Sequence, residues 1–270
     1  MKKRLVSILL ILALCLNTML NGVWIVDAET VEGGMSTQSG EVAEVTIDGS
    51  TKQYTDIKEA FTKAQKAERA TVKLLDNVTI PKDESGYSYG INLSGGDITL
   101  DLNGHTLQTT TEEKGFVSLN AVFYIEGDAA MTVQDSTGKG KIEQPNGGQA
   151  IKVSGGTLTV TSGTIEVTSN VENNKGDTIT TQNCAVFVSG SGTANIQGGT
   201  LIGNKGIYMN GGTLNVTGEP AIQGRNSYAL LAEGGTVQLS GGTYTSESDT
   251  HSIWNSQGTA EELLTSGYRF

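Results

Sequence analysis

Apolar and polar residues alternate in short runs along most of the chain, and the runs recur in a fixed order. Residues 150–167 show the pattern clearly, with alternation over 151–153, 158–160 and 165–167. A period of two is typical of strands that bury one face. Gly155-Gly156 separates the first two runs, and glycine accepts the positive φ angles that tight corners need. The pattern predicts three short strands in each repeat.

The repeats begin with a small residue followed by an alternating apolar run. The openings are Gly90, Ala121, Ala150, Ala185, Gly206 and Ala229, with Ser252 as a seventh. A repeat this short cannot bury its own apolar face, so neighbouring repeats must stack. The sequence therefore predicts an all-β solenoid, a parallel β-helix of about six to seven coils with Val, Ile, Leu and Ala inside.

Two other all-β architectures fit the repeats less well. A propeller blade needs roughly 40 residues or more, about twice the later spacings in this chain. A sandwich does not predict a recurring opening motif with glycines at equivalent positions. The solenoid, placed at residues 84–258, is the favoured fold.

The segment before the solenoid has a different pattern and is expected to cap it. Residues 45–83 contain strand candidates at 45–47 and 71–75. Between them, apolar residues at helical spacing predict a helix over 57–67, with Thr55 or Asp56 as its N-cap. A strand-helix-strand cap would cover the open strand edge of the first coil.

The two ends of the chain have their own signals. Residues 1–28 combine a basic start, an apolar run and a small-residue cleavage site, so we expect a signal peptide. Residues 29–44 are polar and unpatterned, as in a disordered leader. Residues 259–270 form a tail with one helical turn over 260–264, and the chain is expected to be a module of a longer protein. The signal predicts a secreted or cell-surface location, with no membrane span after cleavage.

A short motif near the first coils carries a family resemblance. Asp101-Leu102-Asn103-Gly104-His105-Thr106-Leu107 is similar to a phrase in surface proteins with Gly/Thr-rich repeats. Over roughly residues 45–255 the chain resembles the right-handed parallel β-helix proteins of the pectate-lyase-like superfamily, in particular repeat proteins on the surface of Gram-positive bacteria. The resemblance implies a right-handed β-helix and leaves the activity open, because this fold serves enzymes and adhesins alike.

Charge and cysteine content narrow the choice of partners. The chain has a net charge of −11, which argues against nucleic acid and anionic lipid as ligands. Cys15 lies in the expected signal peptide, which leaves Cys184 without a partner for a disulfide. Cys184 directly precedes an opening residue, so we expect a buried thiol.

The residues that polysaccharide cleavage needs are sparse. None of the strings Asn-Thr-Asp, Asp-Asp, His-Gly or Arg-Ile-Lys occurs in the chain. Asp97, Asp101 and His105 could be read as acids and a proton shuttle, but Asn103-Gly104 favours a turn at this place. No catalytic residue, metal ligand or cofactor is predicted.

The early repeats carry extra residues after their third strand. The insertions span roughly 109–120, 143–149 and 168–183. Insertions at one equivalent corner of a solenoid emerge on one side. They are either tolerated loops without a role or a binding surface. The candidate ligand-binding residues in them are Glu112, Glu113, Asn146, Glu172, Asn173, Asn174 and Lys175.

Three functions remain open. The favoured one is a non-catalytic, adhesin-like surface protein that binds polysaccharide, mucin glycan or a host or cell-surface protein through these loops. The second is a polysaccharide lyase or glycoside hydrolase, and the third is a structural spacer in a larger surface protein. Stacked coils should show an exposed aromatic or polar strip in an adhesin, and a charged cluster in an enzyme.

Overall fold

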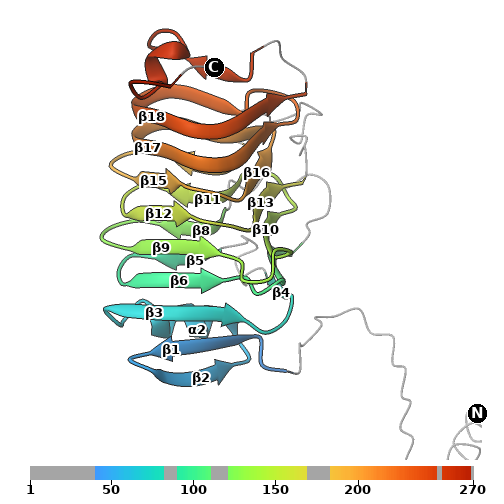
Figure 1. The fold of residues 1–270 in the computed structure, drawn as a ribbon. Helices are drawn as coiled ribbons and strands as arrows, with labels where there is room; N and C mark the ends of the chain where they lie inside the picture. Colours follow the sequence, from blue (N-terminus) through green and yellow to red (C-terminus); the bar gives the residue numbers. More distant parts are fainter. Residues whose placement is uncertain (1–39, 82–89, 111–120, 169–182, 248–250, 269–270) are drawn as a thin grey trace, which may run out of the picture. The chain divides into compact units, whose positions relative to one another are not determined.

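The computed structural model describes residues 40–81, 90–110, 121–168, 183–247 and 251–268. Residues 38–270 form one compact unit. The predicted signal peptide lies outside the described residues, as does the predicted leader up to residue 39. The described part of this unit is all-β with one α-helix, and most of its strand pairs are parallel (Figure 1). Such a sheet is compatible with a β-helix.

The parallel strands form three stacks, and successive repeats add one strand to each stack except the last repeat, which adds β19 to the first stack alone. The first stack contains β5 (Ile91–Leu93), β8 (Ala121–Ile125), β11 (Gln149–Val153), β14 (Cys184–Val188), the start of β17 (Lys205–Gly224), the start of β18 (Leu230–Ser246) and β19 (Ile253–Asn255). The second stack contains β3 (Arg69–Leu74), β6 (Asp97–Asp101), β9 (Ala130–Gln134), β12 (Thr157–Val160), β15 (Thr193–Ile196) and the middle of β17 and β18. The third stack contains β4 (Val78–Ile80), β7 (Thr106–Thr109), β10 (Lys141–Gln144), β13 (Thr164–Val167), β16 (Thr200–Gly203) and the end of β17 and β18.

The strand register confirms most of the predicted openings. Ile207 pairs with Leu230 and Leu230 with Ile253, so the openings just before them are equivalent. One opening was placed a residue too early. Ala121 pairs with Gln149, which makes Val122 the equivalent of Ala150. The side chain of Val122 is fully buried, like that of Ala150, so a larger apolar residue fills this position.

The core lies between the three stacks and consists mainly of their inward-facing aliphatic side chains. Phe123 in the first stack meets Phe61 edge-on, with ring centroids 5.2 Å apart. Both rings are fully buried. Burying two phenylalanines in one contact fastens the helix that carries Phe61 to the solenoid core.

The N-terminal segment pairs differently from the rest. Strand β1 (Ala43–Ile47) runs antiparallel to both β2 (Ser50–Tyr54) and β3. Helix α2 (Ile57–Ala64) ends three residues before the predicted end at 67. Strand β1 begins at Ala43, inside the stretch 29–44 that was expected to be leader, because Val42, Ala43 and Val45 are buried.

The N-cap of α2 gives a first testable prediction. The Asp56 carboxylate accepts hydrogen bonds from the backbone N–H groups of Lys58 (2.7 Å) and Glu59 (3.1 Å). Replacing Asp56 by alanine is expected to destabilise the unit by about 1 kcal/mol, measured by urea unfolding. Asp56→Ser should retain most of that stability, since serine is also a good N-cap. Equal losses in the two variants would contradict the capping role.

No helix among the described residues is long and apolar enough to cross a membrane.

In the C-terminal part, the predicted helical turn is a short 3₁₀ helix, η1 (Glu261–Leu263). Leu264 then forms an isolated parallel bridge to Leu239 of β18.

Candidate functional site

The connections from the third stack to the first stack share one corner of the repeat, here called the third-to-first corner. Ile80, at the end of β4, pairs with Thr109 at the end of β7. Gln144 at the end of β10 pairs with Val167 at the end of β13. The chain therefore leaves the third stack at equivalent positions, as expected for the three insertions. The second insertion is shorter than predicted, because Glu143 and Gln144 belong to β10 and Gln149 to β11.

Most of the predicted ligand-binding residues fall outside the described residues. They are Glu112, Glu113, Glu172, Asn173, Asn174 and Lys175. Asn146 is described, and its side chain is only 6% exposed. Its Nδ2 donates to the carbonyl oxygen of Thr110 (2.6 Å), and its backbone N–H donates to Oε1 of Gln144 (3.2 Å). Asn146 thus ties neighbouring coils together at the third-to-first corner and presents little surface to a ligand.

A line of mostly aromatic and basic side chains runs along the outer face of the first stack. We call it the outer ladder; its members, one from each successive strand, are Tyr124, Lys152, Phe187, Tyr208, Leu231 and Trp254. Each member is the direct register partner of the next, so the spacing is that of neighbouring strands, about 4.8 Å. Inward residues on either side of each member fill the core, which leaves the ladder residues pointing outward.

Contacts between its members hold the outer ladder together. The rings of Phe187 and Tyr208 lie 5.0 Å apart, and Lys152 Nζ lies 5.5 Å from the Tyr124 ring. The Tyr208 hydroxyl donates to Oε2 of Glu233 at 2.6 Å. Phe187 and Leu231 are each 8% exposed, whereas Trp254 is 47% exposed. The ladder is therefore tightly packed in its middle and open at Trp254.

A buried lysine lies beside the ladder, at the third-to-first corner. Lys205 is 5% exposed, and its Nζ is 5.7 Å from the Tyr208 ring. Burial lowers the pKa of Lys205, and the neighbouring Glu233 opposes that shift. Burial also raises the pKa of Tyr208 to about 12, together with its hydrogen bond to Glu233. Tyr208 is consequently a neutral phenol at neutral pH, with its hydroxyl bonded to Glu233 and its ring beside Lys205.

Cys184 occupies the same row of the first stack as Lys205. Its side chain is fully buried, which confirms the predicted buried thiol. Burial raises the pKa of Cys184 to about 12, although Lys205 opposes that shift. A thiol of this kind is protonated at neutral pH and is a poor nucleophile.

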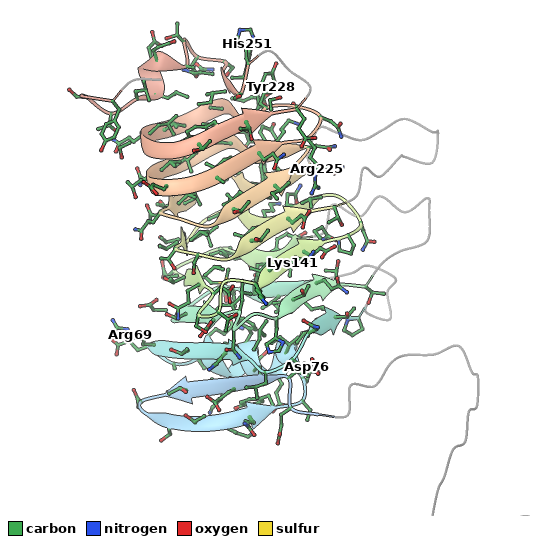
Figure 2. The ribbon with its side chains drawn as sticks, turned by 45° about the vertical axis from the view of Figure 1, so that its right-hand side comes forward. Arg69, Asp76, Lys141, Arg225, Tyr228 and His251 are labelled. Carbon is green, nitrogen blue, oxygen red and sulfur yellow. The ribbon has the colours of Figure 1, made fainter. Side chains whose placement is uncertain are left out.

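Four charged side chains gather on the outer face of the third stack and form what we call the ionic cluster: Lys141, Glu143, Glu166 and Arg225. Glu143 of β10 and Glu166 of β13 are direct register partners. Lys141 pairs with Glu143 and, at 3.4 Å, with Glu166. Lys141 and Arg225 lie on the same side of the unit (Figure 2). All four side chains are half-buried.

The cations of the ionic cluster are firmly engaged. Arg225 forms an ion pair with Glu166 and donates from Nη1 to the carbonyl oxygen of Val167 at 2.8 Å. Burial alone would lower the pKa of Lys141, but the carboxylates of Glu143 and Glu166 outweigh it and raise that pKa. Lys141 is therefore charged at neutral pH and unsuited to act as a base.

The motif at 97–105 forms the turn favoured by its sequence. Asn103 and Gly104 both have positive φ, 48° and 83°, and the His105 N–H donates to the carbonyl oxygen of Leu102 at 2.8 Å. The Asp101 carboxylate accepts from the backbone of this turn and of the next coil. Asp97 instead faces Arg69 at 3.5 Å on the exposed surface. The three candidate residues of a proton relay thus have separate structural contacts.

No three His, Cys, Asp or Glu side chains among the described residues are grouped so as to hold a metal ion. Glu143 and Glu166 are only two such carboxylates, and each is engaged by a cation.

The outer ladder has a signal in the sequence, a fixed position in the repeat, that the sequence analysis did not use. In almost every repeat the ladder residue is the second after the opening, as Lys152 follows Ala150 and Trp254 follows Ser252. The ionic cluster had no such signal, because Arg225 and Glu166 are far apart in the sequence and meet only through stacking.

Comparison of the chain with protein-family models, with curated proteins and with solved structures gave no match. The structure itself shows an all-β unit with a mostly parallel sheet.

Proposed function

We propose that this chain is a secreted or cell-surface, non-catalytic binding protein of the adhesin-like kind. Its described part would be a right-handed parallel β-helix of about six to seven coils, with β1, α2 and β3 as its cap. Residues 1–28 would be its signal peptide. The likeness to the pectate-lyase-like superfamily rests on the repeat and on the three parallel stacks.

The outer ladder is the observation that carries this proposal. It places the exposed Trp254 and the half-buried Tyr124, Lys152 and Tyr208 along one face, next to the corner from which the insertions leave, while Phe187 and Leu231 between them are buried and support the row. Aromatic side chains are enriched at binding surfaces because they offer a large rigid area with an apolar face. A row spaced at the strand repeat suits an extended ligand, such as a polysaccharide chain or an elongated protein segment, better than a compact molecule.

The ionic cluster supports a second candidate, a glycoside hydrolase. Most such enzymes use two carboxylates that flank the scissile bond. Glu143 and Glu166 are direct register partners on neighbouring strands, which brings two carboxylates to one place on the surface. Each is engaged by Lys141 or Arg225, so a sugar would have to displace a cation to reach them. This is why the hydrolase ranks below the binding protein.

A retention assay tests the proposal on the full chain. The protein is incubated with immobilised plant, mucin and cell-wall polysaccharides, with and without calcium, and both bound protein and new reducing or unsaturated ends are measured. We expect retention without products. Products that disappear in Glu166→Gln would establish the hydrolase instead. If the protein is not retained and no products form, the structural spacer is favoured.

A deletion locates the binding face. Residues 169–182 are replaced by a short Gly-Ser linker, while Thr168 and Asn183 stay. Thr168 N–H donates to the carbonyl oxygen of Gln144 at 3.2 Å, and Asn183 Oδ1 accepts from Gly148 N–H at 2.7 Å. We expect retention to fall at least tenfold with an unchanged thermal midpoint. Lys139→Ser, an exposed change at a different corner, is the matched control. Full retention by the deletion variant would place the binding face elsewhere.

A further inference from the structure

The last rung of the outer ladder differs from the others. Trp254 of β19 stacks above Leu231, its register partner, and its ring centroid lies 5.8 Å from that of Tyr228 at a tilt of 32°. Those contacts cover one side of the indole. Trp254 is nevertheless 47% exposed, and it shares this property among the large apolar residues of the described part only with Tyr268. An indole that is packed on one side and open on the other is a rigid, ready-made platform.

A hollow of about 700 Å³ opens beside the platform. Its lining residues lie within 251–261 and include Trp254, His251, Gln257 and Glu261. Figure 2 shows Tyr228 and His251 at this C-terminal end of the unit. A volume of this order is typical of small-molecule sites, which combine an apolar surface with a few polar groups that orient the ligand.

We infer that the Trp254 hollow binds one ring of a neutral saccharide. The apolar C–H face of a pyranose matches the open indole face, and its hydroxyl groups can both donate and accept hydrogen bonds. The hollow offers groups of both kinds, with the carboxylate of Glu261 as acceptor and the amide of Gln257 as donor and acceptor. The inference rests on the proposed function, because it names the ligand class for the last rung of the same ladder.

The negative charge of the chain favours a neutral sugar over a uronic acid or a second copy of the chain as the ligand. The chain carries a net charge of −11, and Glu261 stands in the wall of the hollow with Glu262 next to it in sequence. A uronic acid would bring its own carboxylate against these groups and be repelled. A second copy of this chain would carry the same net charge and be repelled in the same way.

Tryptophan emission reads the site directly. The sequence contains two tryptophans, Trp24 and Trp254, so the full chain with Trp24→Phe reports on Trp254 alone. Cellotetraose, chitotetraose and tetragalacturonate are titrated as probes. We expect the emission to shift with one or both of the neutral oligosaccharides and not with tetragalacturonate. A response to tetragalacturonate alone, or to no probe, would overturn the inference. The inference would also be overturned if the emission shifted with protein concentration while the protein sedimented as a dimer, because the platform would then contact a second copy.

Substitutions distinguish a binding role of the Trp254 indole from a role in the fold. Trp254→Leu keeps an apolar rung like Leu231 but has no aromatic face, and calorimetric affinity for the responding oligosaccharide should fall at least tenfold. Trp254→Phe should restore part of it. Tyr268→Ala removes the other exposed large apolar side chain of the described part and should bind normally. Unchanged affinity in Trp254→Leu would overturn the inference. If no oligosaccharide binds but polymer retention persists and depends on 169–182, the proposed function stands and this inference alone fails.

Discussion

Gly212→Ala is expected to lower the free energy of unfolding by about 3 kcal/mol, the sum of backbone strain and overpacking. Gly212 has a φ of +78°, and a Cβ added there would lie 2.2 Å from the carbonyl oxygen of Gly192 in the coil below. That oxygen accepts a hydrogen bond from the Thr213 N–H at 2.9 Å. The methyl group would therefore force apart two coils at a backbone hydrogen bond, and neither backbone can move alone.

Gly138→Ala is the matched control. Gly138 has a similar φ of +82°, but a Cβ there meets nothing within 4 Å. It should show only the cost of the left-handed backbone, about 1 kcal/mol. Urea unfolding of the two variants and the parent measures the difference. Equal losses would mean that the close approach of the coils contributes nothing, and would contradict the steric explanation.

Asp135→Ala is expected to cost a similar amount, about 3 kcal/mol, because it leaves several donors without their acceptor at once, the N–H of the buried Gly140 among them. The Asp135 carboxylate accepts from the backbone N–H groups of Gly140 (2.6 Å) and Gly104 (2.8 Å) and from the N–H and hydroxyl of Thr137 (3.3 Å each). Gly104 belongs to the preceding coil, so one side chain organises a corner and joins it to its neighbour. Asp128→Ala, an exposed aspartate in a turn, should change stability by less than about 0.5 kcal/mol.

The same carboxylate predicts a pH dependence. Burial tends to raise the pKa of Asp135, but the hydrogen bonds from Gly140, Gly104 and Thr137 outweigh it and lower that pKa below its ordinary value of 3.8. The group therefore stabilises the fold fully above its unfolded pKa, and this contribution is lost as the pH falls through the lower folded pKa. Between pH 7 and pH 2.5 the parent should lose more stability than Asp135→Asn. An identical pH profile for the two proteins would contradict this role.

The repeat could be predicted because it depends on local alternation. Glycines such as Gly156 and the inward pairs beside them mark corners and strands within a few residues, and stacking then follows from the need to bury the apolar side. The misplaced opening at Ala121 has a simple reason. A small residue usually begins the run, but Val122 fits the same buried position, and a rule based on residue size misses it.

The candidate sites were harder to predict because they form across coils. The contact between Tyr208 and Phe187 can be predicted only once the register between their two strands is known. Arg225 reaches Glu166 because its side chain spans more than one level of the stack. Because the insertions differ in length, residues that become neighbours in the stack are not at a constant spacing in the sequence. The loop residues 112–113 and 172–175 remain predictions, since they lie outside the described residues.

The parallel stacks also determine how the unit resists mechanical load. Hydrogen bonds between strands point from one coil to the next, so tension along the stacking direction pulls on one inter-coil boundary after another. The coils would then detach singly, in small steps at low force. A load directed along the strands would instead shear every bond of a boundary together. An anchored protein of this build would yield gradually in one direction and hold firmly in the other.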